Sequence, residues 1–364
     1  MLAPLRDHLR PKDPASSPLL NTTREIYFAR LSGEIPPGKP GFEEARWITT
    51  EDVNVEHLLD VFTTIDANSE CVWDTCNNFM AQLYWHKSRL VTLGQKIEAL
   101  ANDHPSKAEC LFNLARLFDS VGSLVERKRL LSHCLELWRE QGNDFKVART
   151  LRRLSDADRR MGMGREGMWQ AKEASEIFER LGNTVDQALS LIDLAWSLYQ
   201  DGQLNAAEEA ASRGIDLLPE HGEEFSVYEA HRILGHIYQS QGEMEKAIHH
   251  LEIALAVASS LNTAEELFWV NYSLADALSK QGKFEDAQTR LDHAKSHAAN
   301  NTYLLAYAMD RQARVWEGQH RFEEARSEAL RALDIFEKLG AAHDVEDTKG
   351  LLWSIDAQRA GRPS

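Results

Sequence analysis

Turn-forming residues recur at a fixed spacing through most of this chain. Five are glycines separated by 40 residues, and a histidine stands near the next such position: Gly122, Gly162, Gly202, Gly242, Gly282 and His320. A period in this range is typical of solenoid proteins, in which each unit buries its apolar face only against its neighbours. The spacing therefore predicts a repeat fold, although it does not identify a ligand.

The repeating unit is clearest around Gly242, where the chain reads LGHIYQSQGEMEKAIHHLEIAL. Packing residues lie on both sides of the turn, with Leu234, Gly235 and Tyr238 before it and Ala247, Leu251 and Ala254 after it. Small residues allow two antiparallel helices to approach, and large residues fill the space between them. This order resembles the tetratricopeptide (TPR) pattern. The resemblance implies an all-α, right-handed superhelical solenoid of antiparallel helix pairs with a short Pro-rich N-terminal segment.

Agreement with this pattern varies along the array. The units around Gly202 and Gly282 keep it, whereas the unit around Gly122 has Arg127 where alanine is usual. The unit around Gly162 departs from the pattern at three positions, Ser155, Asp158 and Gly167. The sequence pattern therefore defines the boundaries of these two units less sharply than it defines the array as a whole.

Residues suited to a left-handed backbone mark the ends of the helices. Those expected to follow the second helix of a unit are Gly142, Gly182, Gly222, Asn262 and Gly340. Glycine and asparagine are favoured there, whereas histidine adopts this conformation at some energetic cost. We therefore expect the turn at His320 to differ locally from the glycine turns.

Four segments follow from the repeat frame. Residues 1–54 contain most of the prolines, and residues 55–104 are expected to form a helical region with a degenerate repeat. Residues 105–340 hold the TPR array of about six units, and residues 341–364 a capping helix and tail. The capping helix, expected over 343–358, would shield the last apolar face of the solenoid.

A second resemblance lies near the start of the chain. The opening MLAPLRDHLRPKD is similar to the end of the winged-helix module in signal-transducing NTPases of the NB-ARC and NACHT type, and EARWITTEDVNVEHLLDVF is similar to the helix that follows that module. In fungal members of that group, a nucleotide-binding core is joined to a C-terminal TPR array. The resemblance implies that this chain is the sensor part of a STAND-type NTPase, that residues 1–54 contain the remnant of a winged-helix end, and that a nucleotide-binding domain precedes Met1.

The sequence shows no motif for catalysis or cofactor binding. No stretch satisfies Gly-x-x-x-x-Gly-Lys-Ser/Thr, the loop whose backbone amides cradle phosphates. His293 and His297 lie four residues apart on one helical face, but no third ligand accompanies them. The four cysteines lack metal-type spacing and are expected to be reduced packing thiols: Cys71, Cys76, Cys110 and Cys134. We therefore predict a protein that is not an enzyme and holds no cofactor or metal.

Composition predicts a soluble cytoplasmic protein without a membrane segment. The formal net charge is −16, and the N-terminus lacks the apolar core of a secretion signal. No apolar run approaches the ~20 residues that a membrane span requires. The overall acidity also opposes attraction to phosphates, which makes nucleic acid an unfavourable partner.

The first helix of each TPR unit lines the concave surface, and the frame fixes which positions face it. Arginine, histidine and aromatic side chains occupy Arg116, Arg149, Arg152, Arg153, Trp196, Tyr199, Arg232, His236, Trp269, Tyr272 and Arg314, and the same frame adds Asp156, Arg159, Ile192, Gln239, Asp276 and Asp310. Arginine and aromatic residues are frequent interface anchors. We therefore predict a groove for a protein or peptide ligand with acidic groups. In the alternative interpretation, the charges lie on solvated helix surfaces, and Trp196 or Tyr199 belong to the core between units.

Two other functions remain open. A free-standing helical-repeat adaptor would use the same groove without an attached NTPase. An RNA-binding helical repeat would use the arginines, although the groove lacks the regular base-reading pairs of such repeats. The clamp that binds heat-shock-chaperone tails is disfavoured, because Phe112 and Arg116 occupy the slots of its paired Lys and Asn.

Overall fold

The structure is a computed structural model that describes residues 107–120, 123–219, 221–298, 301–339 and 341–360. These residues form thirteen α-helices and no strand, which confirms the all-α prediction for this part of the chain. The chain divides into two compact units, Met1–Ile177 and Phe178–Ser364, and each is described by itself. The predictions for the Pro-rich segment, the degenerate repeat and the winged-helix resemblance fall on 1–106, outside the described residues.

Unit 1 contains three described helices and most of a fourth. Their bounds are Lys107–Ser120 (α6), Leu124–Glu140 (α7), Asp144–Arg160 (α8) and Gly164–Arg180 (α9). α7 packs against both α6 and α8. The side chain of Asn143 caps α8 by accepting a hydrogen bond from the backbone N–H of Lys146 at 3.1 Å. Helix ends and packing in this unit therefore follow the helix–turn–helix order of a TPR array.

The residues of unit 1 that depart from the TPR pattern are satisfied by polar contacts. Arg127 is buried on α7 and donates to Asp156 Oδ2 on α8 at 2.8 Å. Ser155 Oγ donates to the backbone carbonyl of Gly167 at 2.7 Å. A buried polar group is tolerated when it finds such a partner. These contacts take the place of the small apolar residues found in the better-matched units.

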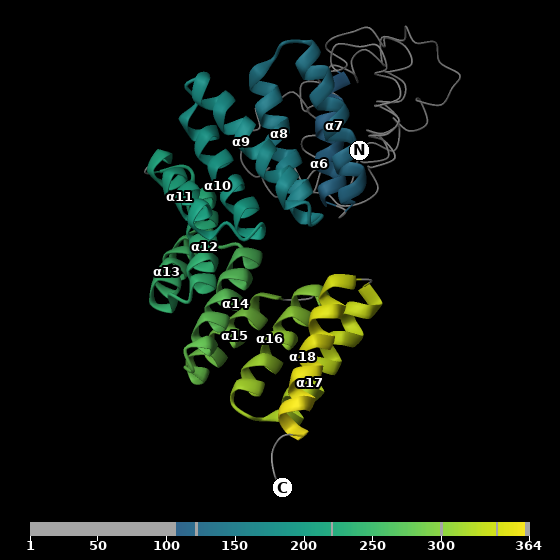
Figure 1. Ribbon diagram of the computed structural model, residues 1–364, viewed down its shortest axis with the longest axis vertical. Helices are drawn as coiled ribbons and strands as arrows, with labels where there is room; N and C mark the ends of the chain where they lie inside the picture. The colour runs from purple at the N-terminus through teal and green to yellow at the C-terminus, as the bar shows by residue number, and fades with distance from the viewer. Residues whose placement is uncertain (1–106, 121–122, 220, 299–300, 340, 361–364) are drawn as a thin grey trace, which may run out of the picture. The chain divides into compact units, whose positions relative to one another are not determined.

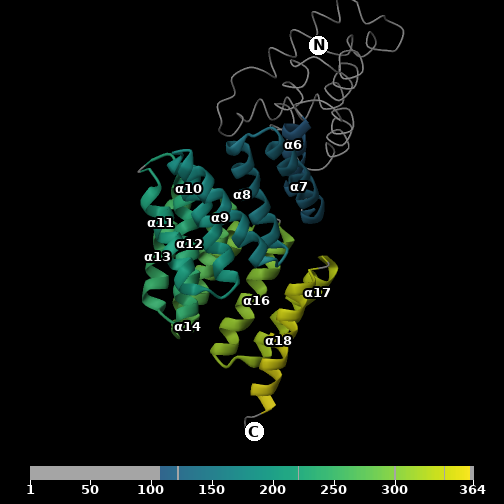
Figure 2. The ribbon, with the colours of Figure 1, turned by 45° about the horizontal axis from the view of Figure 1, so that its top comes forward.

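Unit 2 consists of four helix pairs and a closing helix. The helices are Thr184–Gln200 (α10), Leu204–Leu217 (α11), Glu224–Gln241 (α12), Met244–Leu261 (α13), Ala264–Lys280 (α14), Phe284–Ala298 (α15), Thr302–Gly318 (α16), Phe322–Leu339 (α17) and Ala342–Ala360 (α18). Each pair packs against the next, and α10, α12, α14, α16 and α18 also contact one another in that order. Figures 1 and 2 show α16, α17 and α18 side by side. The first helices of the pairs therefore share one face of the unit.

Left-handed residues lie in the turns between helices at the predicted positions, except for Gly122 and Gly340, which lie outside the described residues. Positive φ angles occur at Gly142, Gly162, Gly182, Gly202, Gly222, Gly242, Asn262, Gly282 and His320. His320 has a φ of 63°, close to the 77° of Gly282, and the backbone hydrogen bonds around the two residues follow the same pattern. The expectation that this turn differs locally is therefore wrong. The histidine adopts the glycine conformation because the packed helices on both sides determine the turn.

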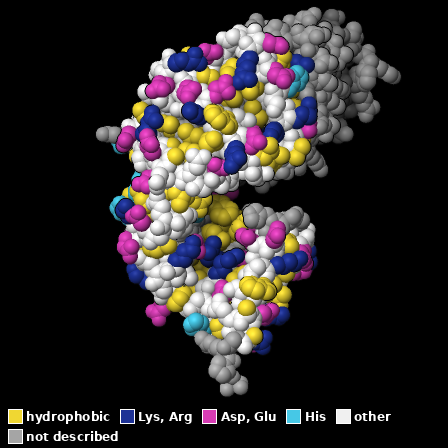
Figure 3. Space-filling model, in the orientation of Figure 1, with side chains coloured by type: hydrophobic (Ala, Val, Ile, Leu, Met, Phe, Trp, Pro, Cys, Tyr) yellow, Lys and Arg dark blue, Asp and Glu magenta, His cyan; other side chains and the backbone are white. Residues whose placement is uncertain are grey.

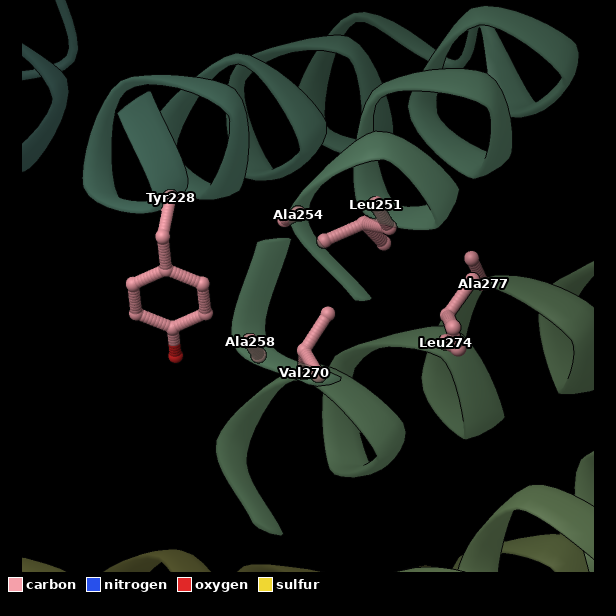
Figure 4. Close-up of a cluster of buried hydrophobic side chains, with 7 residues drawn as sticks. All are labelled: Tyr228, Leu251, Ala254, Ala258, Val270, Leu274 and Ala277. Atoms are coloured by element: carbon pink, nitrogen blue, oxygen red, sulfur yellow. The ribbon is translucent and has the colours of Figure 1, made fainter. Parts of the chain in front are cut away.

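Small residues let α12, α13 and α14 pack closely. Seven buried side chains from these helices form one cluster, shown in Figure 4: Tyr228, Leu251, Ala254, Ala258, Val270, Leu274 and Ala277. Leu251 of α13 lies over Gly235 of α12, and a Cβ atom at Gly235 would stand 2.6 Å from Leu251 Cγ. The glycine of the TPR pattern thus leaves room for the leucine of the partner helix.

A helix occupies the stretch where the capping helix was expected. Leu351 and Ile355 of α18 are buried in a cluster with Ala313 of α16 and Phe322 of α17. Trp353, on the same helix, is 76% exposed. One side of α18 therefore covers the last helix pair, and the other side faces solvent.

Two histidines meet between α12 and α13. The Nδ1 atoms of His231 and His250 lie 2.9 Å apart, and the two rings are stacked with centroids 5.1 Å apart. One nitrogen donates and the other accepts, so at least one ring is neutral. Burial lowers the pKa of His231 to about 4, and His250 and His249 contribute to the shift. Protonation of this pair is therefore unfavourable in the folded protein.

We predict that Gly235→Leu lowers the free energy of unfolding by about 1 to 3 kcal/mol, because the new side chain overlaps Leu251. Gly350→Ala is the matched control, since no atom lies within 4 Å of a Cβ at this exposed helical glycine. The control should be neutral or stabilise by about 0.5 to 1 kcal/mol, the usual gain of alanine over glycine in a helix. Urea denaturation measures both changes, and an unaltered midpoint for Gly235→Leu would contradict the packing described above.

Stability should fall as the pH drops below the pKa of an unfolded histidine, about 6.5. The folded pKa of His231 is about 4, so the unfolded chain binds the proton more tightly between these two values. The contribution of neutral His231 to the free energy of unfolding is complete above the pKa of the unfolded histidine. It is lost as the pH falls towards the pKa of His231 in the folded protein. As the pH falls from about 7.5 to 5.5, the free energy of unfolding should decrease by about 1 kcal/mol less in His231→Gln than in the wild type. If urea denaturation gave the same decrease in unfolding free energy for both proteins, the pair of His231 and His250 would not be the source of the pH dependence.

Candidate functional site

The first cluster of predicted groove residues lies on α10 and α12 and contains Trp196, Tyr199, Arg232 and His236. The guanidinium of Arg232 lies 4.4 Å from the centre of the Trp196 ring, and its Nη2 atom lies 3.0 Å from Glu229 Oε2. Trp196 Nε1 donates to the same carboxylate oxygen at 3.1 Å. These side chains are therefore held by one another, and their orientation is fixed before any ligand arrives.

The second cluster lies on α14 and α16. The ring centre of Tyr307 lies 5.2 Å from that of Trp269 and 5.9 Å from that of Tyr272. The guanidinium of Arg311 lies 4.5 Å from the centre of the Tyr272 ring, and its Nη2 atom donates to the Tyr272 hydroxyl at 2.8 Å. Burial raises the pKa of Tyr272, with Arg311 acting in the opposite direction. The cluster thus combines aromatic surface with a cation.

A pocket of about 510 Å³ adjoins this second cluster. Its lining comes mainly from α14, α16 and α18, and Phe284 of α15 and Phe336 of α17 complete it. Figure 3 shows Lys and Arg side chains beside hydrophobic ones on the surface over α14 and α16. Pockets of this size, with apolar walls and a few placed polar groups, are typical of ligand sites. We therefore take this pocket as the candidate functional site.

The α14 end of the pocket carries an excess of positive charge. Asp276 forms ion pairs with both Arg311 and Lys280, the second at 2.8 Å. Burial alone would raise the pKa of Asp276, but the two cations outweigh it and lower the pKa. Arg311 Nε is buried and has no acceptor among the described residues. One carboxylate thus balances two cations, and this end suits an anionic group.

Asp310 joins α16 to α18 beside the pocket. Its Oδ2 atom accepts a hydrogen bond from Arg314 Nε at 2.8 Å, and its Oδ1 atom accepts one from Thr348 Oγ1 at 3.1 Å. Asp310 and Thr348 are both buried, whereas the Arg314 side chain is 35% exposed. The groove arginine predicted on α16 is therefore fixed by a carboxylate of its own helix.

The α18 end of the pocket is acidic. Asp344 accepts hydrogen bonds from two tyrosine hydroxyls, that of Tyr307 at 2.7 Å and that of Tyr303 at 3.0 Å. Burial, followed by the hydrogen bonds with Tyr303 and Asp344, raises the pKa of Tyr307, which keeps its hydroxyl protonated. Asp347 follows on the same helix; it is exposed and has no partner among the described residues. The two ends of the pocket therefore differ in charge.

The remaining predicted groove residues lie in unit 1 and are described apart from the pocket. Arg153 is exposed, and three arginines are half-buried: Arg116, Arg149 and Arg152. The guanidinium of Arg149 lies 4.5 Å from the centre of the Phe112 ring. On α8, burial alone would raise the pKa of Asp156, but Arg159 and Arg127 lower it to about 2. The arginines of α8 thus share their surface with an ionised carboxylate.

Sequence reasoning placed Tyr272, Asp276, Asp310 and Arg314 on the face that lines the pocket, but it missed other lining residues. The missed residues include Lys280, Tyr307, Arg311, Asp344, Asp347 and Thr348. The last three were missed because α18 was treated only as a cap. The repeat spacing could have identified these residues. Thr348 follows Asp310 by nearly the number of residues that separates equivalent positions on successive first helices elsewhere.

Neither a metal site nor a membrane span is found in the part of the chain that the structure describes. No group of three His, Cys, Asp or Glu side chains gathers there in a way that would hold a metal ion. Among the described helices, none has the length and apolar character needed to cross a bilayer. Cys110 and Cys134 are buried free thiols, and burial raises the pKa of Cys134 to about 12.

Comparison with known proteins identifies the repeat type. Residues 165–343 match the model of the MalT-like TPR region. Among solved structures, a STAND protein with a tetratricopeptide repeat sensor from Pyrococcus horikoshii matches with a TM-score of 0.63 at 15% identity, covering 99% of this chain and 52% of that one. This chain thus spans about half the length of that protein.

Two further solved structures share the fold. Aspartyl phosphate phosphatase F from Bacillus subtilis matches with a TM-score of 0.59 at 14% identity, covering 89% of this chain and 95% of that one. A Rap protein complexed with competence and sporulation factor matches with a TM-score of 0.57 at 14% identity, covering 92% of this chain and 99% of that one. A search of curated proteins gave no match. Residues 165–343 are therefore similar to the MalT-like TPR region, and the described helices share the fold of tetratricopeptide-repeat arrays.

Proposed function

We propose that this chain is a non-catalytic scaffold that binds a peptide or an extended protein segment in the pocket between α14, α16 and α18. The observation that carries the proposal is the pocket itself, in which an aromatic wall and charged side chains meet on the shared face of the first helices. The TPR fold supports a protein-interaction role. The complex of a Rap protein with competence and sporulation factor is a supporting analogy at the level of fold alone.

The α14 end of the pocket favours an acidic group on the ligand. Asp276 balances only one of the charges on Arg311 and Lys280, and Lys280 is half exposed at 50%. A ligand carboxylate placed there would gain charge-assisted hydrogen bonds without displacing the pair between Arg311 and Asp276. Apolar groups of the ligand would contact Tyr272 and Tyr307. The charge at this end of the pocket supports the acidic ligand that the sequence predicts.

We further propose that the array serves as the sensor part of a STAND-type NTPase in the cytoplasm. The STAND protein from Pyrococcus horikoshii, which also carries a TPR sensor, supports this at the level of fold. Binding at the pocket would then regulate a nucleotide-binding domain by contact rather than by chemistry of the array. Sequencing the coding region upstream of Met1 tests the proposal, because a P-loop followed by helical domains is expected there, and a stop codon in frame would contradict it.

The binding proposal is tested by selecting random peptides displayed on phage against the full chain. Enriched peptides should lose on the order of tenfold in affinity for Lys280→Glu, because one attractive charge is replaced by a repulsive one. Lys283→Glu is the matched control, since Lys283 is exposed in the next turn and does not line the pocket. Isothermal titration calorimetry with a selected peptide measures both variants. Failure to enrich any peptide, or equal affinity of both variants, would contradict binding at this pocket.

The arginines of α8 form a second proposed contact, within unit 1. Arg153 is exposed and Arg152 is half-buried, so charge reversal of both should cost little stability. If they contact acidic groups of a ligand that binds unit 1, the double reversal should weaken binding of a peptide selected on that unit several-fold while thermal stability stays close to that of the wild type. Unchanged affinity would assign these arginines to a solvated helix surface.

A further inference from the structure

The acidic end of the pocket provides an inference that rests on the proposed function and extends it. The pocket lining contains three cations, Lys280, Arg311 and Arg314, and five carboxylates, Asp276, Asp310, Glu317, Asp344 and Asp347. The lining therefore carries two negative charges in excess.

Every cation of the lining is paired with a carboxylate of α14 or α16. Lys280 and Arg311 pair with Asp276, and Arg314 pairs with Asp310 at 2.8 Å. Asp276 and Asp310 are thus neutralised within the array. The excess negative charge is left on the side of α18 and the end of α16.

The carboxylates of α18 are available to a ligand. Among the residues that the structure describes, Asp344 is bound only by two neutral hydroxyl groups, those of Tyr303 and Tyr307, and these do not cancel its charge. Asp347 is exposed and has no partner among the described residues. A carboxylate accepts up to about four hydrogen bonds, so Asp344 also retains capacity after binding both tyrosines.

The ring of Tyr307 stands beside these carboxylates. Tyr307 lines the pocket and is half-buried, and its ring packs against the buried ring of Phe336 with the two centres 5.4 Å apart. A guanidinium or ammonium group near the Tyr307 ring gains a cation–π attraction in addition to the charge of the carboxylates. Its aliphatic stem would pack against the same ring. Carboxylates beside an aromatic ring therefore suit a basic side chain better than a small inorganic cation.

We propose that the α18 end of the pocket binds an arginine or lysine side chain of the peptide ligand, held by Asp344 and Asp347 against the ring of Tyr307. The acidic group of the ligand lies at the opposite end, beside Lys280. A ligand with both charges can enter the pocket in only one direction without placing like charges together. The pocket therefore selects the order of charges along the peptide as well as its composition.

The test uses the same selection of displayed peptides against the full chain, followed by sequencing of the enriched pool. Arginine or lysine should be enriched at one position of the wild-type pool. In a parallel selection against Asp347→Asn that enrichment should disappear. This substitution is well suited to the test because Asp347 is exposed and makes no hydrogen bond or ion pair with the described residues.

Affinity measurements complete the design. A selected peptide should lose about tenfold in affinity for Asp347→Asn, and replacing its basic residue by glutamine should remove most of the difference between the two proteins. Asp334→Asn is the control, because Asp334 is an exposed carboxylate of α17 outside the pocket, and it should bind like the wild type.

The outcomes separate this inference from the proposed function. Enriched peptides that depend on Lys280 but show no basic preference would overturn the inference and leave the proposed function standing. The inference would also be overturned if the preference for basic residues persisted in the selection against Asp347→Asn and if Asp347→Asn and Asp334→Asn lost peptide affinity equally. Such a result would reflect only the net charge of −16. Failure to enrich any peptide would overturn both.

Discussion

Close approach of helices at small residues is the constraint on which unit 2 depends. Gly235 admits Leu251, and buried alanines such as Ala247 and Ala254 line the same interface. Because the glycine makes room for Leu251 and the alanines are small, the helices approach closely and successive pairs pack in the same register. That register places residues about one period apart on neighbouring first helices, which brings Tyr272 and Arg311 together. The pocket is therefore a consequence of repeat packing, assembled from residues distant in sequence.

Charge on the first helices is largely balanced within the array. Arg232, Arg311 and Arg314 each contact a carboxylate of the same or a neighbouring helix. Such pairs hold long side chains in one orientation, and removing one partner would leave an uncompensated charge. A ligand consequently meets the charge that remains after this pairing. The excess is positive near Lys280 and negative along α18, although arginines are the more conspicuous feature of the sequence.

The sequence predicted the repeat, its turns and the face on which the pocket lies, because small residues and left-handed turns have a local signature. Side-chain pairing was harder to predict. Asp158 departs from the TPR pattern, yet it is buried with its carboxylate 2.6 Å from the ammonium of Lys128 on α7, a contact that depends on tertiary packing. Trp196 likewise contacts Arg232 and Glu229 rather than standing free. The contacts of α18 were not predicted because that helix was treated only as a cap.

The central claim is that a peptide occupies the shared face of α14, α16 and α18. Hydrogen–deuterium exchange of the full chain, with and without a selected peptide at saturating concentration, tests it most directly. Bound peptide should slow exchange in α14, α16 and the first half of α18, because local opening of these helices then requires release of the ligand. Protection confined to α11, α13 and α15, with no change in the three pocket helices, would contradict the account.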